Sequence, residues 1–346
     1  MRIGLIGYGR VGQAFIKLII DKKESLKNKG LELIVNYIIK SDGGIYNSTG
    51  INLEEIVEAQ DIKKSIFWDE CMSFKNIIEN HDVDIIVELT PTNKITGEPG
   101  ITHMREALKN KISVVTGNKG PILLNYRELK SLAIENNVSL EIGCTTGGAL
   151  PSINTGLYGI AGSDIIKIEG ILNGTSNFIL KKMEESNKQN IVSKENVGLS
   201  YNEALEIAQK EGIAETDPTL DVEGFDTAIK MIILTNVILD QNITLDDVEI
   251  EGISKLKKED IIKADEENKK IKLLGKTYYK DNKVKISVKP TLISENHPLY
   301  NVDGKNKGIT FDTDTLGEIS VIGGASGVIN AAASILRDIV NIIERR

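Results

Sequence analysis

The chain has 346 residues, which is long for a single hydrophobic core and suits two domains. Hydrophobic residues make up 40% of it and charged residues 27%, which excludes a disordered or fibrous protein. The formal net charge of −8 argues against a nucleic-acid partner, because most of such a surface repels phosphate groups.

Short apolar runs recur through the first part of the chain and alternate with stretches of helical spacing. The runs cover residues 3–6, 33–39, 83–87, 112–115 and 138–142. Strands that are buried on both faces and linked by helices give this rhythm, so it predicts an α/β fold with a doubly wound parallel sheet. Residues 12–28 are predicted to be the first connecting helix. We therefore expect residues 1–150 to form a dinucleotide-binding domain of the Rossmann type.

The pattern changes after Pro151, where a second domain is predicted to begin. Apolar and polar residues alternate in two segments, which predicts strands, and two others have helical spacing. The predicted strands are residues 165–171 and 284–293, and the predicted helices are 201–211 and 225–239. We assign residues 151–325 to an α+β domain for substrate binding and dimerisation.

Two further segments have a helical or strongly charged character. Residues 255–283 are rich in lysine and glutamate, with positive and negative charges intermixed. We interpret them as a solvated helix without a function of its own. The last apolar residues recur at helical spacing, so residues 326–346 are predicted to pack as a helix against the first domain.

The cysteines and histidines indicate the cellular compartment of the protein and limit the kinds of metal site that it can have. Cys71 and Cys144 lack paired spacing, which is typical of a reducing compartment and predicts no cysteine-based metal site. We interpret the three scattered histidines as surface or loop residues. The chain begins directly with an apolar run, and no segment has the roughly 18 consecutive apolar residues of a membrane helix. We therefore expect a cytoplasmic protein without a membrane partner.

A GxGxxG motif follows the first apolar run and opens the first predicted helix. Its glycines permit a tight turn, close approach of a pyrophosphate and close packing of the helix, whose N-terminus offers unpaired N–H groups. In this context the motif indicates a bound nicotinamide dinucleotide. The cofactor contacts that it predicts are Gly7, Gly9, Arg10, Val11 and Gly12.

The residues after the second predicted strand bear on the choice between NAD and NADP. Asp42 favours the free 2′-hydroxyl of NAD, whereas Lys40, together with Arg10, favours the 2′-phosphate of NADP. The two signals conflict, and the balance leans slightly towards NADP.

Two lysines are candidates for the proton transfer that accompanies hydride transfer, since a lysine serves there when its surroundings lower its pKa. Lys119 follows an apolar strand, where an open parallel sheet binds its ligands. Lys230 lies one helical turn after Asp226, a spacing that fits a surface ion pair equally well. The acidic residues before it favour a functional interpretation, because they would repel one another without a cationic guest such as a substrate ammonium group. They are Glu215, Asp217, Asp221 and Glu223.

Several motifs, in order along nearly the whole chain, resemble those of homoserine dehydrogenase. They are Val87-Glu88-Leu89-Thr90-Pro91-Thr92-Asn93, Thr116-Gly117-Asn118-Lys119, Gly170-Ile171-Leu172-Asn173-Gly174-Thr175 and residues 215–230. The resemblance implies the interconversion of L-homoserine and L-aspartate 4-semialdehyde with NAD or NADP, on the route to threonine and methionine.

The resemblance also implies roles for individual residues. Lys230 would donate or accept the proton, with Lys119 beside the nicotinamide and the reacting oxygen. The implied substrate-binding residues are Glu215, Asp221, Asp226, Gly174 and Thr175, and the further dinucleotide contacts are Thr90, Lys119, Gly212 and Gly327. Gly327 lies in a segment, residues 323–327, that is similar to the GxGAG of the family.

Three further expectations come from the family pattern. Family members hold sodium with a glutamate and backbone carbonyls before a proline, but Gly143 stands where that glutamate is expected. At most a weak Na⁺ site is therefore predicted, at the carbonyls of Thr146 and Gly148. The family is dimeric through its second domain, so we expect a homodimer. The chain ends at Arg346 after its final helix, so we expect a short form without a regulatory domain.

Two rival interpretations are a cysteine-dependent semialdehyde dehydrogenase and a dinucleotide-binding sensor without turnover. The first would use Cys144 as a nucleophile, but no histidine stands in a recognisable relation to it. The second leaves the two lysines and the carboxylates without a purpose.

Overall fold

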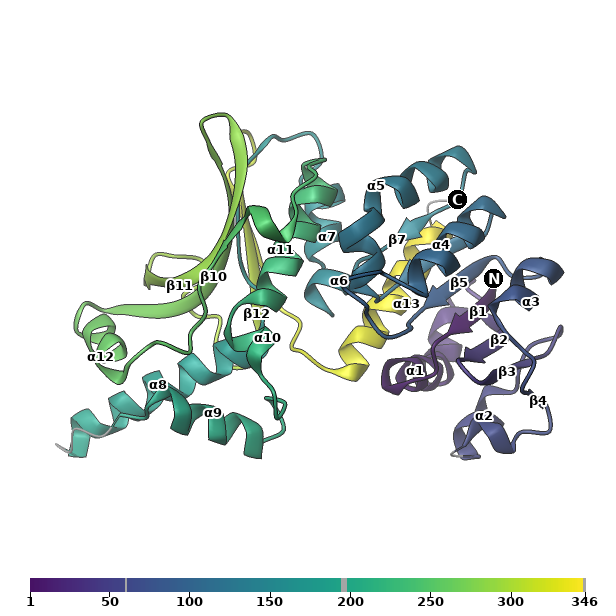
Figure 1. Ribbon diagram of the computed structural model, residues 1–346, viewed down its shortest axis with the longest axis horizontal. Helices are drawn as coiled ribbons and strands as arrows, with labels where there is room; N and C mark the ends of the chain where they lie inside the picture. The colour runs from purple at the N-terminus through teal and green to yellow at the C-terminus, as the bar shows by residue number, and fades with distance from the viewer. Residues whose placement is uncertain (60, 194–197, 345–346) are drawn as a thin grey trace. The chain divides into compact units, whose positions relative to one another are not determined.

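The structure is a computed structural model that describes residues 1–59, 61–193 and 198–344 (Figure 1). The chain divides into two compact units. The first comprises residues 1–149 and 327–346, and the second comprises residues 150–326. The limits expected from the sequence are residues 150 and 325.

A seven-stranded sheet forms the centre of the first unit, in the order β4-β3-β2-β1-β5-β6-β7. The five predicted strands are all present and pair in parallel, which is the predicted doubly wound arrangement. They are β1 (Arg2–Ile6), β2 (Ile34–Lys40), β5 (Ile85–Glu88), β6 (Ser113–Thr116) and β7 (Leu140–Glu141). Two antiparallel strands that the sequence did not predict, β3 (Gly43–Tyr46) and β4 (Trp68–Asp69), extend the sheet beyond β2.

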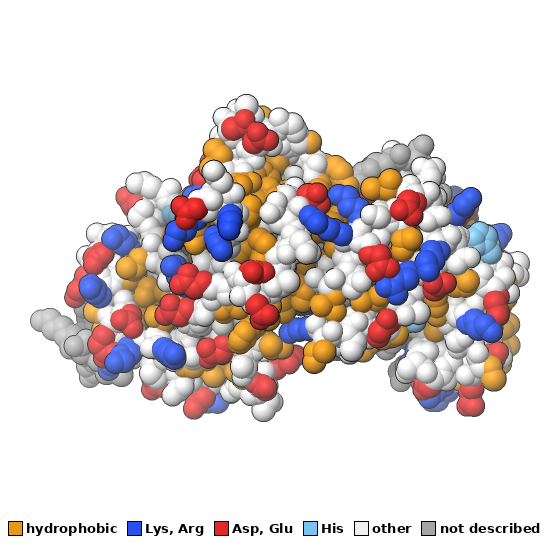
Figure 2. Space-filling model, turned by 45° about the horizontal axis from the view of Figure 1, so that its top comes forward, with side chains coloured by type: hydrophobic (Ala, Val, Ile, Leu, Met, Phe, Trp, Pro, Cys, Tyr) orange, Lys and Arg blue, Asp and Glu red, His pale blue; other side chains and the backbone are white. Residues whose placement is uncertain are grey.

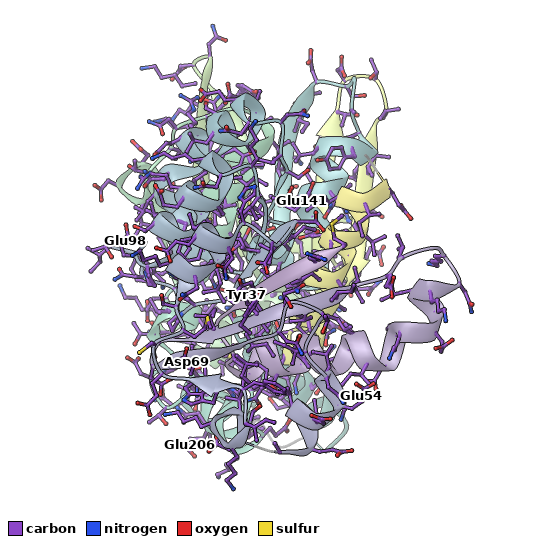
Figure 3. All side chains as sticks on the ribbon, turned by 90° about the vertical axis from the view of Figure 1, so that its right-hand side faces the viewer. Tyr37, Glu54, Asp69, Glu98, Glu141 and Glu206 are labelled. Atoms are coloured by element: carbon purple, nitrogen blue, oxygen red, sulfur yellow. The ribbon has the colours of Figure 1, made fainter. Side chains whose placement is uncertain are left out.

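Helices cover both faces of this sheet, as expected for strands that are apolar on both sides. They are α1 (Arg10–Lys27), α2 (Leu53–Glu58), α3 (Phe74–Asn80), α4 (Gly100–Lys109), α5 (Lys119–Glu135), α6 (Cys144–Gly147) and α13 (Val328–Glu344), with a 3₁₀ turn at Ile62–Lys64. The C-terminal helix α13 returns to lie beside α1, and its Ile335 and Ile339 are fully buried in the same core as Phe15. Tyr37 of β2 is enclosed among side chains, whereas Glu54 of α2 is exposed (Figure 3).

The second unit contains a six-stranded sheet in the order β13-β12-β8-β10-β11-β9. Its strands are β8 (Ile165–Ile171), β9 (Val248–Ile250), β10 (Lys269–Lys280), β11 (Lys283–Ser294), β12 (Lys307–Thr313) and β13 (Glu318–Gly323). Its helices are α7 (Ser152–Asn154), α8 (Gly174–Ser193), α9 (Tyr201–Lys210), α10 (Thr219–Val222), α11 (Phe225–Ile238) and α12 (Lys258–Glu266), with short turns at Thr155–Gly159 and Leu245–Asp247. This mixed unit matches the predicted α+β domain.

One sequence interpretation is wrong. Residues 255–283 do not form a solvated helix, because only Lys258–Glu266 is helical and Lys269–Lys280 is a strand inside the sheet. Lys272 is only 1% exposed, and its ammonium group donates to Asp303 Oδ1 at 2.8 Å and to the carbonyl of Val302 at 2.7 Å. Burial lowers the pKa of Lys272, whereas Lys181 and Lys272 hold the pKa of Asp303 down at about 2 against its own burial. The high charge content therefore reflects internal ion pairs as well as solvated surface.

Helix α11 packs closely against β10, and this contact fixes the helix that carries Lys230. A β-carbon at Gly275 would lie 2.5 Å from Met231, so only glycine permits the approach. The hydroxyl groups of Thr235 and Thr277 lie 2.7 Å apart and share a hydrogen bond across the same contact. Two contacts one helical turn apart, at Met231 and at Thr235, therefore hold the helix to the sheet just after Lys230.

The surface carries both charged and apolar side chains, as the composition leads one to expect. Acidic and basic side chains are interspersed on the visible face, with apolar side chains between them (Figure 2). Among the described residues, no helix is both long and apolar enough to cross a membrane.

Candidate active site

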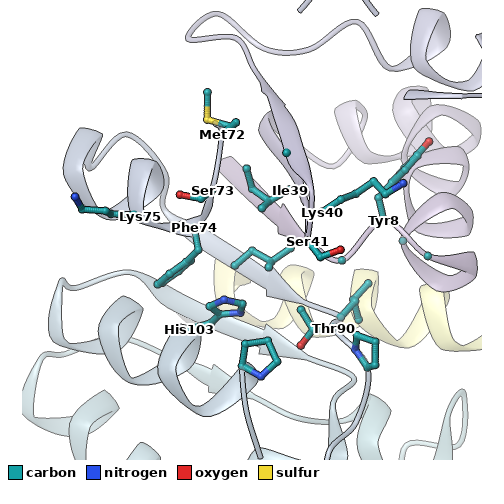
Figure 4. Close-up of a pocket in the computed structure, with 18 of the residues that line it drawn as sticks. Tyr8, Ile39, Lys40, Ser41, Met72, Ser73, Phe74, Lys75, Thr90 and His103 are labelled. Carbon is teal, nitrogen blue, oxygen red and sulfur yellow. The ribbon is translucent and has the colours of Figure 1, made fainter. Parts of the chain in front are cut away.

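A cavity of about 1020 Å³ opens in the first unit at the carboxyl ends of β1, β2 and β5 (Figure 4). All of the predicted GxGxxG contacts line it, together with Lys40 and Thr90. The lining also includes side chains that the sequence did not single out. Those from the segment before and within α3 are Glu70, Cys71, Met72, Ser73, Phe74 and Lys75, and those from α4 and the loop before it are Pro99 and His103.

The three glycines of the motif have different steric environments. Gly7 has φ of +98°, and a β-carbon there would lie 2.5 Å from the carbonyl oxygen of Leu89. A β-carbon at Gly12 would clash with the carbonyl oxygen of Gly7, so this glycine allows α1 to pack against the turn. Gly9 has no heavy atom within 4 Å of its β-carbon position, so this position faces open space.

The N-terminus of α1 suits an anion. Its N-cap residue is Gly9, which has no side chain to accept from the first-turn N–H groups, and the first turn carries no acidic residue. Those N–H groups and the positive end of the helix dipole are therefore available to a pyrophosphate. The residues present thus fit a dinucleotide on both steric and electrostatic grounds.

Lys40 and Asp42, the two charged side chains that bear on the choice between NAD and NADP, have different surroundings at the end of β2. Asp42 is paired with Lys63, whose ammonium nitrogen lies 2.5 Å from its carboxylate, and this hydrogen bond lowers the pKa of Asp42. Lys40, Ser41 and Arg10 line the cavity, and Asp42 is not part of the lining. Lys40 and Arg10 thus bring two cations to the lining, which also contains the carboxylate of Glu70.

Glu88, at the end of β5, is a fully buried carboxylate that lies next to Thr90, a residue of the cavity lining. Its Oε1 accepts hydrogen bonds from the backbone N–H and from the hydroxyl group of Thr90. The amide of Asn118 donates to the same hydroxyl at 3.2 Å, and its oxygen accepts from the N–H of Gly120 at 3.2 Å. Glu88 therefore fixes both Thr90 and the turn that leads into α5.

Lys119 is the first residue of α5 and is half-buried. It is not among the residues that line the cavity. Its position at the end of β6 is nevertheless fixed, because Asn118 caps the helix immediately before it.

The interpretation of His103 as a surface or loop residue is wrong. It lies within α4 and lines the cavity, and its ring packs against that of Phe74 at a tilt of 42°, with 4.6 Å between the ring centroids. Its Nδ1 is buried and lies 3.6 Å from Glu88 Oε1, so the histidine and the carboxylate can pair when the ring is protonated. Its sequence context carries no motif, and only the fold turns it towards Glu88.

In the second unit, the structure brings together Asp221, Asp226 and Lys230, which we call the carboxylate–lysine cluster. Lys230 is only 8% exposed, and its ammonium group donates to Asp226 Oδ2 and, at 2.8 Å, to the carbonyl of Leu172. Asn173 donates to Asp221 Oδ1 at 2.7 Å and to Asp226 Oδ2 at 2.9 Å. The Asp226–Lys230 pair is therefore mostly buried, which excludes the simple surface ion pair that the spacing alone allowed.

Some of the remaining predicted residues of this unit lie next to the cluster in the chain, and others lie exposed to solvent. Gly174 and Thr175 begin α8, directly after Asn173, and the hydroxyl group of Thr175 donates to the carbonyl of Ile213 at 3.3 Å. Glu215 and Gly212 lie exposed in the segment between α9 and α10, and no hydrogen bond joins the Glu215 carboxylate to the cluster among the described residues. Gly327 lies at the start of the chain's return to the first unit, directly before α13.

The segment with the predicted cation carbonyls lies in the first unit, at α6. A β-carbon at Gly143 would lie 2.6 Å from Oδ1 of Asp338, a fully buried residue of α13. A glutamate at this position would collide with that carboxylate, which explains the glycine. Thr146 is buried in α6, and Gly148 ends it with φ of +60°.

Cys144, the nucleophile of one rival interpretation, begins α6 and packs against α13. Its thiol lies 3.7 Å from the carbonyl of Ala331, and its side chain borders the main core of the unit. None of the described histidines is paired with it. Cys144 is accordingly a small, partly buried residue packed against the core, and the cysteine-dependent mechanism has no support.

A dinucleotide cavity and a buried lysine beside carboxylates define an NAD(P)-dependent oxidoreductase that acts on a CH–OH group. Comparison with known families gives the same answer. Residues 151–340 match the family model described as homoserine dehydrogenase, and residues 7–142 match that of the homoserine dehydrogenase NAD binding domain. The chain belongs to the homoserine dehydrogenase family.

Individual relatives match over nearly the whole chain. The homoserine dehydrogenase of Methanocaldococcus jannaschii is 39% identical, over 99% of this chain and 98% of the relative. The NAD(+)-dependent homoserine dehydrogenase of Pseudomonas canavaninivorans is 36% identical, over 99% and 96%. A solved structure of a hyperthermophilic archaeal homoserine dehydrogenase mutant in complex with NADPH matches with a TM-score of 0.81 and 27% identity, over 100% of this chain and 98% of the other.

Proposed function

We propose that the protein interconverts L-homoserine and L-aspartate 4-semialdehyde, with Lys230 as the group that transfers the proton. The observation that carries the proposal is the buried carboxylate–lysine cluster, in which an ammonium group is hydrogen-bonded to Asp226 beside a second carboxylate. Two carboxylates so close together favour a cationic guest, and the ammonium group of an amino acid is such a guest. The family membership supports the same reaction.

Each residue of the cluster has a part in the proposed reaction. When bound, the nicotinamide accepts or supplies the hydride. As a neutral amine, Lys230 takes the proton of the substrate hydroxyl during oxidation, and as an ammonium group it returns that proton during reduction, while Asp226 orients the lysine. Asp221 and Asp226 hold the amino acid by charge, so that its reacting carbon is kept in one position. We assign Lys119 the role of a second cation, which stabilises negative charge on the substrate oxygen.

The test is an absorbance assay at the reduced-nicotinamide band, with L-homoserine and either NADP or NAD. L-Lactate serves as the control alcohol, because it lacks the ammonium group that the cluster would bind. We expect reduction with homoserine and none with lactate. If the protein binds dinucleotide but reduces none with homoserine, the proposal is wrong.

We propose that NADP is the preferred dinucleotide. Lys40 and Arg10 line the cavity at the end of β2, whereas the carboxylate of Asp42 is neutralised by Lys63. The two cationic side chains at this place attract the 2′-phosphate that distinguishes NADP, and Glu70 is the acidic residue of the same lining. Relatives differ in this respect, since one is named as NAD(+)-dependent and another was solved with NADPH.

Replacing Lys40 with alanine should raise the KM for NADP about tenfold or more, because one cation beside a phosphate contributes on the order of 1.5–3 kcal/mol. The KM for NAD should stay within about twofold, since NAD has no phosphate there. Lys64→Ala is the matched control, a lysine of the neighbouring 3₁₀ turn that does not line the cavity. An equal effect on both dinucleotides would contradict the preference.

We infer a homodimer that is formed through the second unit. Four large apolar side chains on the strands of its sheet are exposed over about half of their surface, namely Ile166, Tyr279, Leu292 and Ile322. The strand register places Tyr279 and Leu292 on one face of the sheet and Ile322 on the other, so the inference rests on the family resemblance as well as on these exposed side chains. Static light scattering should give twice the mass of the 38.0 kDa chain. A mass equal to one chain at micromolar concentration would contradict this inference.

We propose at most a weak monovalent cation site at the carbonyls of Thr146 and Gly148. The position that would carry a ligating glutamate is Gly143, and the neighbouring space holds the Asp338 carboxylate. Replacing sodium and potassium salts with a choline salt at equal ionic strength should therefore change kcat by less than about twofold. A loss of activity that potassium or sodium alone restores would show that a strong site exists.

A further inference from the structure

Asn173 joins the parts of the carboxylate–lysine cluster without belonging to the residues assigned a role so far. It lies between β8 and α8 and is only 5% exposed. We propose that Asn173 is a positioning residue, which sets the geometry of Asp221, Asp226 and Lys230 for proton transfer. This inference rests on the proposed function of the cluster.

The side-chain oxygen of Asn173 is used to fix the start of α8. It accepts hydrogen bonds from the backbone N–H of Ser176 at 2.9 Å and from the hydroxyl group of Ser176 at 3.1 Å. This is the geometry of an N-cap, in which a side-chain oxygen satisfies an N–H of the first turn. The amide plane of Asn173 is thereby held in one orientation, and its nitrogen can only point the other way.

The side-chain nitrogen points to the two carboxylates. It donates to Asp221 Oδ1 at 2.7 Å and to Asp226 Oδ2 at 2.9 Å, so both of its N–H groups are used. Asp221 lies on α10 and Asp226 on α11, and the shared amide holds these two elements at a fixed separation. It also stabilises both ionised carboxylates, which would otherwise repel each other.

Asn173 further controls the direction of the Lys230 ammonium group. Asp226 Oδ2 accepts from both Asn173 and Lys230, so the amide determines where the acceptor for the lysine lies. The other acceptor for Lys230 is the carbonyl of Leu172, which is the neighbour of Asn173 in the chain. Two of the three ammonium N–H groups thus have fixed partners, and the direction of the third follows from them.

The chemistry of the asparagine side chain explains why this residue type is suitable. A neutral amide has two N–H donors for two carboxylates and an oxygen for the helix cap. Aspartate would keep the cap but add a third negative charge, and serine would keep the cap but lack the pair of donors. These two substitutions therefore separate the capping role from the positioning role.

The experiment compares Asn173→Ser, Asn173→Asp and the control Ser176→Ala. The control removes a hydrogen bond from the same cap and leaves the carboxylate contacts intact. We expect kcat/KM for homoserine oxidation to fall about tenfold to a hundredfold in Asn173→Ser and less than about threefold in Ser176→Ala. The Kd for NADPH, which reports on the first unit, should stay at the wild-type value in all three.

The pH profile provides a result that a purely structural role would not produce. In Asn173→Asp the added negative charge favours protonated Lys230, whereas oxidation needs this lysine as a base. The rise of kcat/KM with pH should therefore move to higher pH, by about half a unit or more. An unmoved profile in Asn173→Asp overturns the inference, as does a wild-type-like kcat/KM in a folded Asn173→Ser. If the wild-type protein itself does not oxidise homoserine, the proposed function fails instead.

Discussion

Replacing Lys230 with alanine is expected to lower kcat for homoserine oxidation by on the order of a hundredfold or more. The lysine is buried, and its ammonium group is fixed by Asp226 and by the carbonyl of Leu172. Alanine removes the proton acceptor and leaves the carboxylates without their cation. Dinucleotide binding should be unaffected, because the cavity lined by the glycine motif belongs to the first unit.

Stopped-flow measurement of kcat and titration of NADPH fluorescence together test this expectation. Lys181→Ala is the matched control, since Lys181 is also a largely buried lysine of the second unit, paired with Asp303 at 2.8 Å. It should keep kcat within about threefold of the wild type, even if its thermal midpoint falls. Full activity in Lys230→Ala would remove this lysine from the mechanism.

The second large effect is expected from Gly9→Val, which should weaken dinucleotide binding by about a hundredfold or more, or roughly 2.7 kcal/mol. No protein atom lies within 4 Å of the β-carbon position of Gly9, and its φ of −84° is accessible to any residue. The valine should therefore be tolerated by the fold and should project into the space that a pyrophosphate would fill. Isothermal titration calorimetry with NADPH measures the loss.

A second glycine of the motif provides the contrast. Gly12→Ala places a methyl group against the carbonyl oxygen of Gly7, so we expect a lower thermal midpoint in that variant. In Gly9→Val the midpoint without ligand should stay close to the wild-type value, because nothing in the protein has to move. Wild-type affinity in Gly9→Val would show that the dinucleotide does not lie across this turn.

The sequence predicted the parts of the fold that depend on periodicity and missed those that depend on distant partners. The buried parallel strands are continuous apolar runs, which makes them visible in the sequence. By contrast, β3 begins with two glycines and β4 has only two residues, so neither carries an apolar signal. The strand Lys269–Lys280 was mistaken for a helix because its buried lysines look like solvated residues until Asp303 is brought against them.

The residues of the candidate site divide in the same way, into those that a sequence motif identifies and those whose role depends on contacts with distant residues. The GxGxxG motif identified residues that line a cavity, and of the acidic run before Lys230 it is Asp221 that lies in the carboxylate–lysine cluster. His103 could not be recognised, because its role comes from a contact with Glu88. Asn173 belongs to a family motif, but its role comes from contacts with the two aspartates that the sequence does not show. Glu215 and Asp217 are different cases, since they share the acidic run but lie exposed to solvent.

The return of α13 to the first unit has a consequence for the order in which the protein folds during synthesis. Ala332, Ile335, Ile339 and Ile342 complete the core around α1 and the first strands, although they follow the whole second unit in the chain. The core of the first unit therefore cannot be completed until the second unit has been synthesised. The second unit is encoded without interruption and can reach its native packing while the first still lacks a helix. A nascent chain stalled before residue 328 would expose the apolar face of α1, which makes this the stage most in need of a chaperone.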